Sequence, residues 1–293
     1  MKNWRHVWPA DKLCQMMQVT SRGFRKWLTR PMSKRAHGDM TVLAHIREHY
    51  GLSLGTYGRP RMTMELKEVG LDVGERRVGR LMHINGIKPV RTRRHKVTTN
   101  SNHSLEIVAN VLDGNFTADT PNAKWAGDIS YVWTAQGWLY LAVILDLHSR
   151  RVIGFLLAIA SNRLSDNGAV SDRMKKDLAI QALDMAVKLR SPPQGCIVHN
   201  DRGSQYCAYD YQKRLQRYGL TPSMSGKGNC YDNASVETFF KTIKAELIWR
   251  QSWPTRRQAE AAIYSYINGF YNARRCHTYL GGISPLAFEA KRA

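Results

Sequence analysis

The sequence has few acidic residues, few cysteines and no long apolar segment. Its longest apolar runs, residues 138–145 and 152–160, are far shorter than the ~18 residues that a membrane span needs. No charged-then-apolar signal segment opens the chain. The five cysteines are widely spaced without a Cys-x-x-Cys pair, which argues against a disulfide framework and a cysteine-based zinc site. We therefore expect a protein of the reducing cytoplasm with no membrane partner.

The shortage of acidic residues leaves a large positive charge. The 293 residues include 44 Lys and Arg but 23 Asp and Glu, a formal charge of +21. Such an excess usually indicates a polyanionic partner, most often nucleic acid. Residues 1–100 carry 21 basic and 7 acidic residues, a net charge of +14, and residues 101–293 carry the other +7. The first third of the chain is therefore predicted to be the main nucleic-acid-binding part.

This first third is predicted to consist of short helices. The expected helices cover residues 12–17, 22–28, 40–50, 59–68 and 75–84. Thr20 or Ser21 is placed to cap the second of them. The last two are joined by a glycine-containing turn, as in a helix-turn-helix, and the second bears Arg76, Arg77 and Arg80. The alternative is a small three-helix bundle with an ordinary solvated basic face.

A basic and polar stretch without helical periodicity follows. Its cations Arg91, Arg93, Arg94 and Lys96 are expected to track phosphate groups. The alternative is a solvated spacer.

Two histidines in the helical part have a spacing that could suit a metal ion. His45 and His49 lie four residues apart and could bind a metal from one helix face. A zinc module would need a downstream Cys-x-x-Cys pair, which the sequence lacks. We therefore interpret both as surface or packing histidines.

In the remaining two thirds of the chain, the pattern of apolar residues changes from helix-like to strand-like segments. Strands are expected at residues 124–134, 137–146, 151–158, 195–200 and 220–224. Helices are expected at residues 176–189, 204–218, 233–249 and from Thr255, as the cap, to about 275. This order predicts an α/β fold with a mixed sheet and helices packed against it. Trp125, Trp133 and Trp138 are expected to lie in its core; the alternative is that they stack on nucleic-acid bases.

Three acidic residues occupy unusual positions. Asp128 lies inside an otherwise uncharged strand, where a lone acid is costly, and Asp201 ends a short apolar strand. Glu237 begins a helix after the glycine-rich loop 225–229, with 35 residues between it and Asp201. Lys244 falls on the same helix face as Glu237. For Asp201 and Glu237, ordinary roles at a strand end and at a helix dipole are the alternatives.

Chemistry gives such a set of acids a purpose. Mg²⁺ prefers carboxylate oxygens together with substrate phosphate, and Mn²⁺ can take its place. Two such ions about 3.5–4 Å apart can promote phosphodiester displacement. A basic protein with an acidic pocket for metal fits that reaction. Lys227 in the glycine-rich loop could touch the DNA strand there, although a solvated residue is the default.

Several motifs around these acids resemble the bacterial insertion-sequence transposases that are encoded in two reading frames and are related to retroviral integrases. The motifs are residues 125–131 (WAGDISY), 199–206 (HNDRGSQY), 223–234 (SMSGKGNCYDNA) and 237–244 (ETFFKTIK). Weaker similarity covers residues 19–27, 57–61 and 274–285.

This resemblance implies a fold and an activity. The fold would be a ribonuclease-H-like mixed five-stranded sheet with helices on both faces, preceded by an all-α helix-turn-helix-type region. The activity would be Mg²⁺-dependent cleavage and strand transfer at the ends of a mobile element, catalysed by a polynucleotidyl transferase. Asp128, Asp201 and Glu237 would be the catalytic metal-binding acids, with two ions expected, and Lys244 would contact DNA. The rivals are a catalytically idle DNA-binding protein derived from a transposase, and a nuclease for RNA–DNA hybrids.

The resemblance also implies partners and a division of the chain. The partners would be the terminal repeats of the element, target DNA, further copies in a dimer or higher assembly, and the upstream-frame product, at the bacterial nucleoid. The given chain would be the downstream-frame product. The expected parts are a basic helical segment (1–35), a helix-turn-helix-like domain (36–90), a linker (91–118), the catalytic core (119–275) and a C-terminal tail (276–293).

Overall fold

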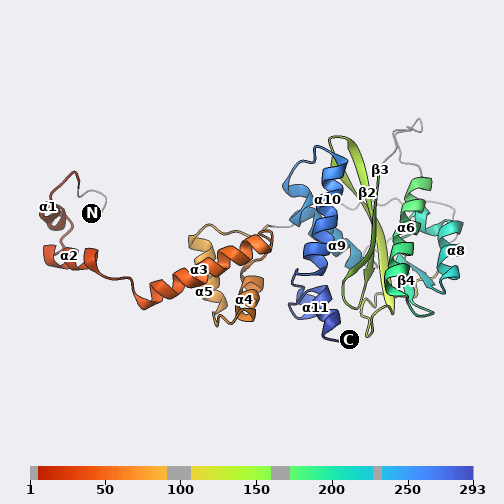
Figure 1. Ribbon diagram of the computed structural model, residues 1–293, viewed down its shortest axis with the longest axis horizontal. Helices are drawn as coiled ribbons and strands as arrows, with labels where there is room; N and C mark the ends of the chain where they lie inside the picture. Colours follow the sequence, from red (N-terminus) through yellow and green to blue (C-terminus); the bar gives the residue numbers. More distant parts are fainter. Residues whose placement is uncertain (1–5, 91–106, 160–171, 227–232, 293) are drawn as a thin grey trace.

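The computed structural model describes residues 6–90, 107–159, 172–226 and 233–292 (Figure 1). The first two helices, α1 (Ala10–Met16) and α2 (Ser21–Thr29), lie apart from the rest of the protein in Figure 1. The side chain of Thr20 accepts a hydrogen bond from Gly23 N at 3.1 Å, so Thr20, one of the two proposed residues, is the cap of α2.

Helices α3 (Lys34–Leu52), α4 (Arg59–Glu68) and α5 (Glu75–Ile84) form a helical module around a shared apolar core. The predicted bounds of α4 and α5 are confirmed. Helix α3 begins earlier than predicted because the Ser33 side chain caps it, accepting from Ala36 N at 3.1 Å. The fully buried core side chains of this module are Ile46, Met62, Leu66 and Val78.

The predicted five-stranded mixed sheet is confirmed. Its strands are β1 (Lys124–Thr134), β2 (Gly137–Asp146), β3 (Val152–Ile159), β4 (Ile197–Asn200) and β5 (Thr221–Met224). They lie in the order β3-β2-β1-β4-β5, in which β1 to β3 are antiparallel neighbours and β4 and β5 run parallel to β1. Strand β1 pairs with β2 over residues 125–134 but with β4 only over residues 124–127.

Helices cover both faces of this sheet (Figure 1). On one face lie α6 (Asp172–Arg190), α7 (Ser204–Cys207) and α8 (Tyr209–Arg217), and on the other lie α9 (Ala234–Glu246) and α10 (Arg256–Ser265). Strand β1 alternates between the two cores: Trp125 belongs to the α6 side, whereas Ala126 and Val132 pack with the residues of α9. None of the described helices is long and apolar enough to cross a membrane.

Some helices differ from their predicted bounds. The predicted helix 204–218 is interrupted at Ala208, whose backbone is extended with φ −64° and ψ 136°. Helix α9 ends at Glu246, before a 3₁₀ turn, Ile248–Arg250. The last predicted helix is α-helical only to Ser265 and continues as a π-helical segment, Tyr266–Asn272, in which Tyr266, Phe270 and Tyr271 are buried. Thr255 is confirmed as its cap.

The prediction for the tryptophans is correct for one of three. Trp125 is fully buried, but Trp133 and Trp138 are 59% and 40% exposed. Both lie near the turn of the β1–β2 hairpin, beyond the part of β1 that pairs with β4. The alternation along a strand predicts on which face of the sheet a side chain lies. It does not predict how far the helices cover that face, and therefore not whether the side chain is buried.

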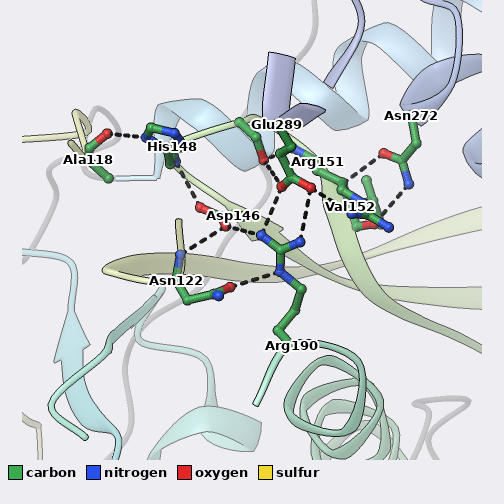
Figure 2. A network of polar contacts seen from close by, with 10 residues as sticks. Ala118, Asn122, Asp146, His148, Arg151, Val152, Arg190, Asn272 and Glu289 are labelled. Carbon is green, nitrogen blue, oxygen red and sulfur yellow. Dashed lines mark hydrogen bonds and ion pairs between the residues drawn. The ribbon is translucent and has the colours of Figure 1, made fainter. Parts of the chain in front are cut away.

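A buried ionic network joins the C-terminal helix α11 (Pro285–Ala290) to the sheet (Figure 2). Arg190 at the end of α6 binds Asp146 of β2 at 3.0 Å and Glu289 of α11 at 2.8 Å. Arg151 also binds Glu289, at 2.6 Å. Although burial opposes the shift, hydrogen bonds from Arg190, Ser149 and Arg151 lower the pKa of Glu289. One guanidinium thus neutralises two carboxylates, one of them fully buried.

We predict that Arg190→Met destabilises the protein by about 3–5 kcal/mol, because it leaves Asp146 buried without its cation. Denaturant unfolding measures this loss. The matched control is Arg59→Met, which breaks an exposed pair with Glu75 and should cost about 1 kcal/mol or less. Equal losses in the two variants would contradict the structural role of the network.

The helical module contacts the segment that follows the π-helical turn. Tyr57 Oη donates a hydrogen bond to Arg274 O at 3.3 Å and accepts one from Cys276 N at 2.7 Å. Cys276 Sγ donates to Glu65 Oε1 of α4 at 2.9 Å. Arg250 also donates to the backbone carbonyl of Leu54. Residues more than 190 positions apart thus hold the module against the sheet-containing part.

His277 lies beside this contact in a positive environment. Its ring packs edge-on against Tyr271 at 4.8 Å. Burial and the charges of Arg275, Arg61 and Arg150 lower the pKa of His277 to about 3. Because this folded-state pKa lies below the ordinary value, His277 binds its proton more readily in the unfolded chain than in the folded protein. The folded protein therefore keeps its full stability above about pH 6.5 and loses part of it as the pH falls toward 3.

We therefore predict that lowering the pH from 7.5 to 5 costs the wild type about 2 kcal/mol that His277→Gln does not lose. Denaturant unfolding at both pH values measures the difference. The same acid sensitivity in wild type and variant would show that His277 is not its source.

Candidate active site

Strand pairing places two of the predicted acids side by side. Gly127 of β1 lies opposite Asn200 of β4 in the parallel ladder. The next residues along the two strands are Asp128 and Asp201, so both carboxylates emerge at the carboxyl end of β4. Ligands of open α/β sheets bind at this kind of edge.

Local hydrogen bonds fix the backbone around the two acids. Asp128 Oδ1 accepts from Ile129 N at 2.7 Å, and Asp201 Oδ1 accepts from Gly203 N at 2.9 Å. Asn200 Nδ2 donates to Gly127 O at 3.0 Å across the ladder. A side chain at Gly127 would come within 2.6 Å of that amide nitrogen, so glycine is needed for this close approach.

Helix α9 brings the third acid to the same edge. Its apolar side chains Val236 and Phe239 are buried against the sheet, and Asn233 Nδ2 just before the helix reaches Gly127 O at 3.4 Å. Glu237 lies in the first turn of α9 and is half-buried. Its Oε2 lies 3.3 Å from Lys241 Nζ.

The predicted site residues act on one another electrostatically. Burial raises the pKa of Asp128 well above its ordinary value, and the negative charges of Asp201 and Glu237 raise it further. A hydrogen bond from Ile129 N and the charge of Lys244 oppose this rise. Burial lowers the pKa of Lys244, and Asp128 opposes that shift. The three acids and Lys244 therefore lie close enough for their charges to shift the pKa of Asp128.

The donor chemistry of the site fits a divalent cation. Two negative neighbours penalise the charged form of Asp128, and a bound cation would remove that penalty. Carboxylate oxygens are the ligands that hard cations prefer. The oxygens of the three carboxylates do not all lie within 4.8 Å of one another. In the described part of the chain, only His45, Glu48 and His49 offer three ligand atoms that close together.

Those two histidines have ordinary environments. His49 is buried and its Nδ1 shares a hydrogen bond with Glu65 Oε2 at 3.1 Å. His45 lies on the surface with its Nδ1 3.7 Å from Glu48. The packing and surface roles expected from the sequence account for both.

The predicted DNA-contacting arginines of α5 have different surroundings. Arg76 is exposed. Arg77 and Arg80 bind Asp39 of α3 at 2.7 and 2.5 Å, and these hydrogen bonds lower the pKa of Asp39. The DNA-binding role of all three remains a prediction. The other predicted contacts, Arg91, Arg93, Arg94, Lys96 and Lys227, lie outside the described residues.

Sequence reasoning missed two polar residues of the site. Asn200 links β1 to β4 and also accepts from Tyr211 Oη at 3.1 Å. Lys241 is the close cationic neighbour of Glu237. The position of Asn200 just before Asp201 and the i, i+4 spacing of Lys241 were the available signals.

Comparison with known proteins agrees with this architecture. Residues 118–230 and 237–292 match two families described as integrase core domain, and residues 38–95 match an HTH-like domain. The protein is therefore of the integrase class, with a helix-turn-helix-like domain before its core.

Full-length relatives give the family. An uncharacterized 31 kDa protein of insertion element IS600 from Shigella sonnei is 39% identical over 279 residues, which cover 95% of this chain and 98% of that protein. Transposase InsF for insertion sequence IS3A of Escherichia coli (strain K12) is 39% identical over 285 residues, with 95% and 93% coverage. The chain belongs to this family of insertion-sequence transposases.

Solved structures are more distant. The HTLV-2 integrase catalytic core domain in complex with magnesium is 17% identical, with a TM-score of 0.41, over 58% of this chain and 97% of that one. The catalytic domain of Mos1 mariner transposase is 12% identical, with a TM-score of 0.41, over 50% and 70%.

Proposed function

We propose that this protein binds the ends of a mobile DNA element and catalyses DNA strand cleavage and strand transfer at Asp128, Asp201 and Glu237. The observation that carries the proposal is the strand register that places Asp128 beside Asp201 at the carboxyl end of β4, where Asp201 and Glu237 both raise the pKa of Asp128. Acids with a purely structural role are usually kept apart, because like charges that lie close together repel one another. Here three acids share one edge of a strongly basic protein.

The acids would hold Mg²⁺, with two ions expected and Mn²⁺ as a substitute. When bound, these ions activate the attacking oxygen and stabilise the leaving oxygen of a phosphodiester displacement. The chain itself supplies position. The β1–β4 ladder positions Asp128 and Asp201, the packing of α9 positions Glu237, and Lys244 would bring a positive charge to a phosphate next to the acids.

The remaining parts would hold and pair the DNA. The helical module would bind the terminal repeats with Arg76, Arg77 and Arg80, and the 91–118 linker would continue the contact with phosphates. Two element ends have to be joined to a target, so we propose a dimer or higher assembly, to which the upstream-frame product belongs. We propose the same division of the chain as the sequence predicts, and we place the reaction at the bacterial nucleoid.

We predict that Asp201→Asn abolishes Mg²⁺-dependent cleavage of element-end DNA, a loss of at least about 100-fold, and leaves DNA binding intact. A cleavage and strand-transfer assay with labelled end DNA measures this. The matched control is Asp210→Asn, because Asp210 of α8 is an exposed aspartate that pairs with Lys176 of α6. Full cleavage by Asp201→Asn would contradict the proposal. If the wild type binds end DNA but does not cleave it, the protein is instead a catalytically idle DNA-binding protein.

We predict that Lys244→Ala weakens the binding of end DNA. The slope of log affinity against log salt concentration should become smaller by about one, because one phosphate contact is lost. Fluorescence anisotropy at several salt concentrations measures both quantities. Lys244 lies 5.5 Å from the ring centre of the exposed Tyr131, and Lys213 on α8 lies 5.6 Å from that of the exposed Tyr209, so Lys213→Ala is the matched control. An unchanged salt slope for Lys244→Ala would show that this ammonium does not contact phosphate.

A further inference from the structure

Residues 10–29 form two short helices joined by a tight turn. Helix α1 has 7 residues and α2 has 9, and only the segment 17–20 separates them. We call residues 10–29 the N-terminal unit. It lies apart from the helical module in Figure 1, and the match to an HTH-like domain begins after it, at residue 38. The DNA contacts proposed above do not include this unit.

The turn sets the directions of both helices. Gln18, in the left-handed region at φ 52°, donates its backbone N–H to Gln15 O at 3.1 Å. Val19 N donates to Cys14 O at 3.0 Å, and together the two hydrogen bonds form the Schellman end of α1. The capping residue of α2, Thr20, follows directly. Two helices joined by a turn of about three to four residues have the form of a helix-turn-helix.

Helix α2 has a buried side and a basic side. Each helix of the unit contributes one buried side chain, Cys14 from α1 and Phe24 from α2. Successive residues of an α-helix are turned by about 100°. Arg22 and Lys26, two positions before and after Phe24, therefore lie about 160° away from it, and both are exposed. Helix α2 thus directs a basic face to solvent, opposite its buried side.

The N-terminal unit carries an excess of positive charge. It includes four Lys and Arg against one acidic residue, Asp11, which lies 3.6 Å from Arg25. Within the part of the chain that the structure describes, no carboxylate pairs with Arg22 or Lys26. Two of the three arginines of α5, by contrast, are bound by a carboxylate of α3. The basic face of α2 is therefore the less neutralised of the two.

We propose that the N-terminal unit is a second helix-turn-helix, whose helix α2 reads base edges in the major groove of the element-end DNA. This inference rests on the proposed function, which supplies the element ends as the DNA. The major groove admits one α-helix, and the second helix of a helix-turn-helix places its N-terminal residues on the base edges. Arg22 lies in the first turn of α2 on its basic face, so we assign the base contact to Arg22. A guanidinium can bind guanine O6 and N7 bidentately.

Charge favours duplex DNA over a second copy of this chain as the occupant. Each copy carries +21, and two basic faces of α2 would repel one another. Lys26 lies one turn after Arg22 on the same face, where it would bind a phosphate at the edge of the groove. The N-terminal unit and the helical module lie apart (Figure 1), so the end DNA would be contacted at two separate places.

The test compares the wild-type chain with Arg22→Ala and Arg22→Lys. The probes are a labelled duplex of the terminal-repeat sequence and a duplex of the same length and composition in scrambled order. Fluorescence anisotropy without divalent metal measures the affinities, so the result does not depend on cleavage. We expect both variants to bind the end duplex at least about fivefold more weakly, because neither keeps the guanidinium fork. Arg22→Lys should bind the scrambled duplex as the wild type does, since its charge is kept.

A chemical probe and a control variant sharpen the result. Methylation of guanine N7 in the end duplex should weaken wild-type binding at one position in particular, and Arg22→Ala should lose that sensitivity. Arg217→Ala is the matched control, because it removes an exposed arginine from α8 and should keep the wild-type preference for the end duplex. Arg22 is exposed, and an unchanged unfolding curve establishes that its variants are folded.

The proposal is overturned if Arg22→Lys keeps the preference for the end duplex, or if the wild type binds both duplexes equally. It is also overturned if Arg22→Ala weakens both duplexes by the same factor, since Arg22 would then contact phosphate alone. A changed oligomeric state with an intact preference would show that α2 is a contact between copies. These outcomes concern binding without metal, whereas the proposed catalytic function fails only in the cleavage assay on Asp201→Asn. The two failures are therefore distinguishable.

Discussion

The short parallel pairing between β1 and β4 is the constraint on which the site depends. The ladder covers only residues 124–127 of β1, and the next residue on each strand is an aspartate. The amide of Asn200 and the absence of a side chain at Gly127 hold the two strands in this register. If β4 were longer, the edge of β1 beyond Asp128 would be paired and closed. The early end of one strand thus places the acids together and leaves room beside them.

The mutual repulsion of the acids is the second consequence of this geometry. The pKa of Asp128 is raised by burial and by the charges of its two neighbours, with Lys244 as a cation acting against the rise. A folded protein tolerates such an arrangement because other interactions stabilise it. The Arg190–Glu289 network and the contacts of Tyr57 with the 274–276 segment supply such stabilisation at sites distant in sequence from the acids.

The sequence predicted the regular elements well and the long-range contacts poorly. The bounds of β1 and β2 follow from alternation on both sides of a glycine turn, and those of α4 and α5 follow from Pro60 and the glycines between them. Asp128 was proposed because an acid inside an apolar strand is uncommon, and Asp201 because ligands meet a sheet at its strand ends. Their catalytic role remains a prediction. No local pattern indicates that Tyr57 binds residues near 275 or that Ala208 interrupts a helix. The exposure of Trp133 was also missed, since it depends on where the cover of the sheet ends.

We propose that the three carboxylates act together as one cation site. Calorimetric titration of Mg²⁺ alone into wild type, Asp128→Asn, Asp201→Asn, Glu237→Gln and the double variant Asp128→Asn/Asp201→Asn tests this proposal. We expect each single substitution to weaken Mg²⁺ binding by at least about tenfold and the double variant to lose less than the sum of the two single effects. A single variant that binds Mg²⁺ as tightly as the wild type would show that its residue does not belong to the site.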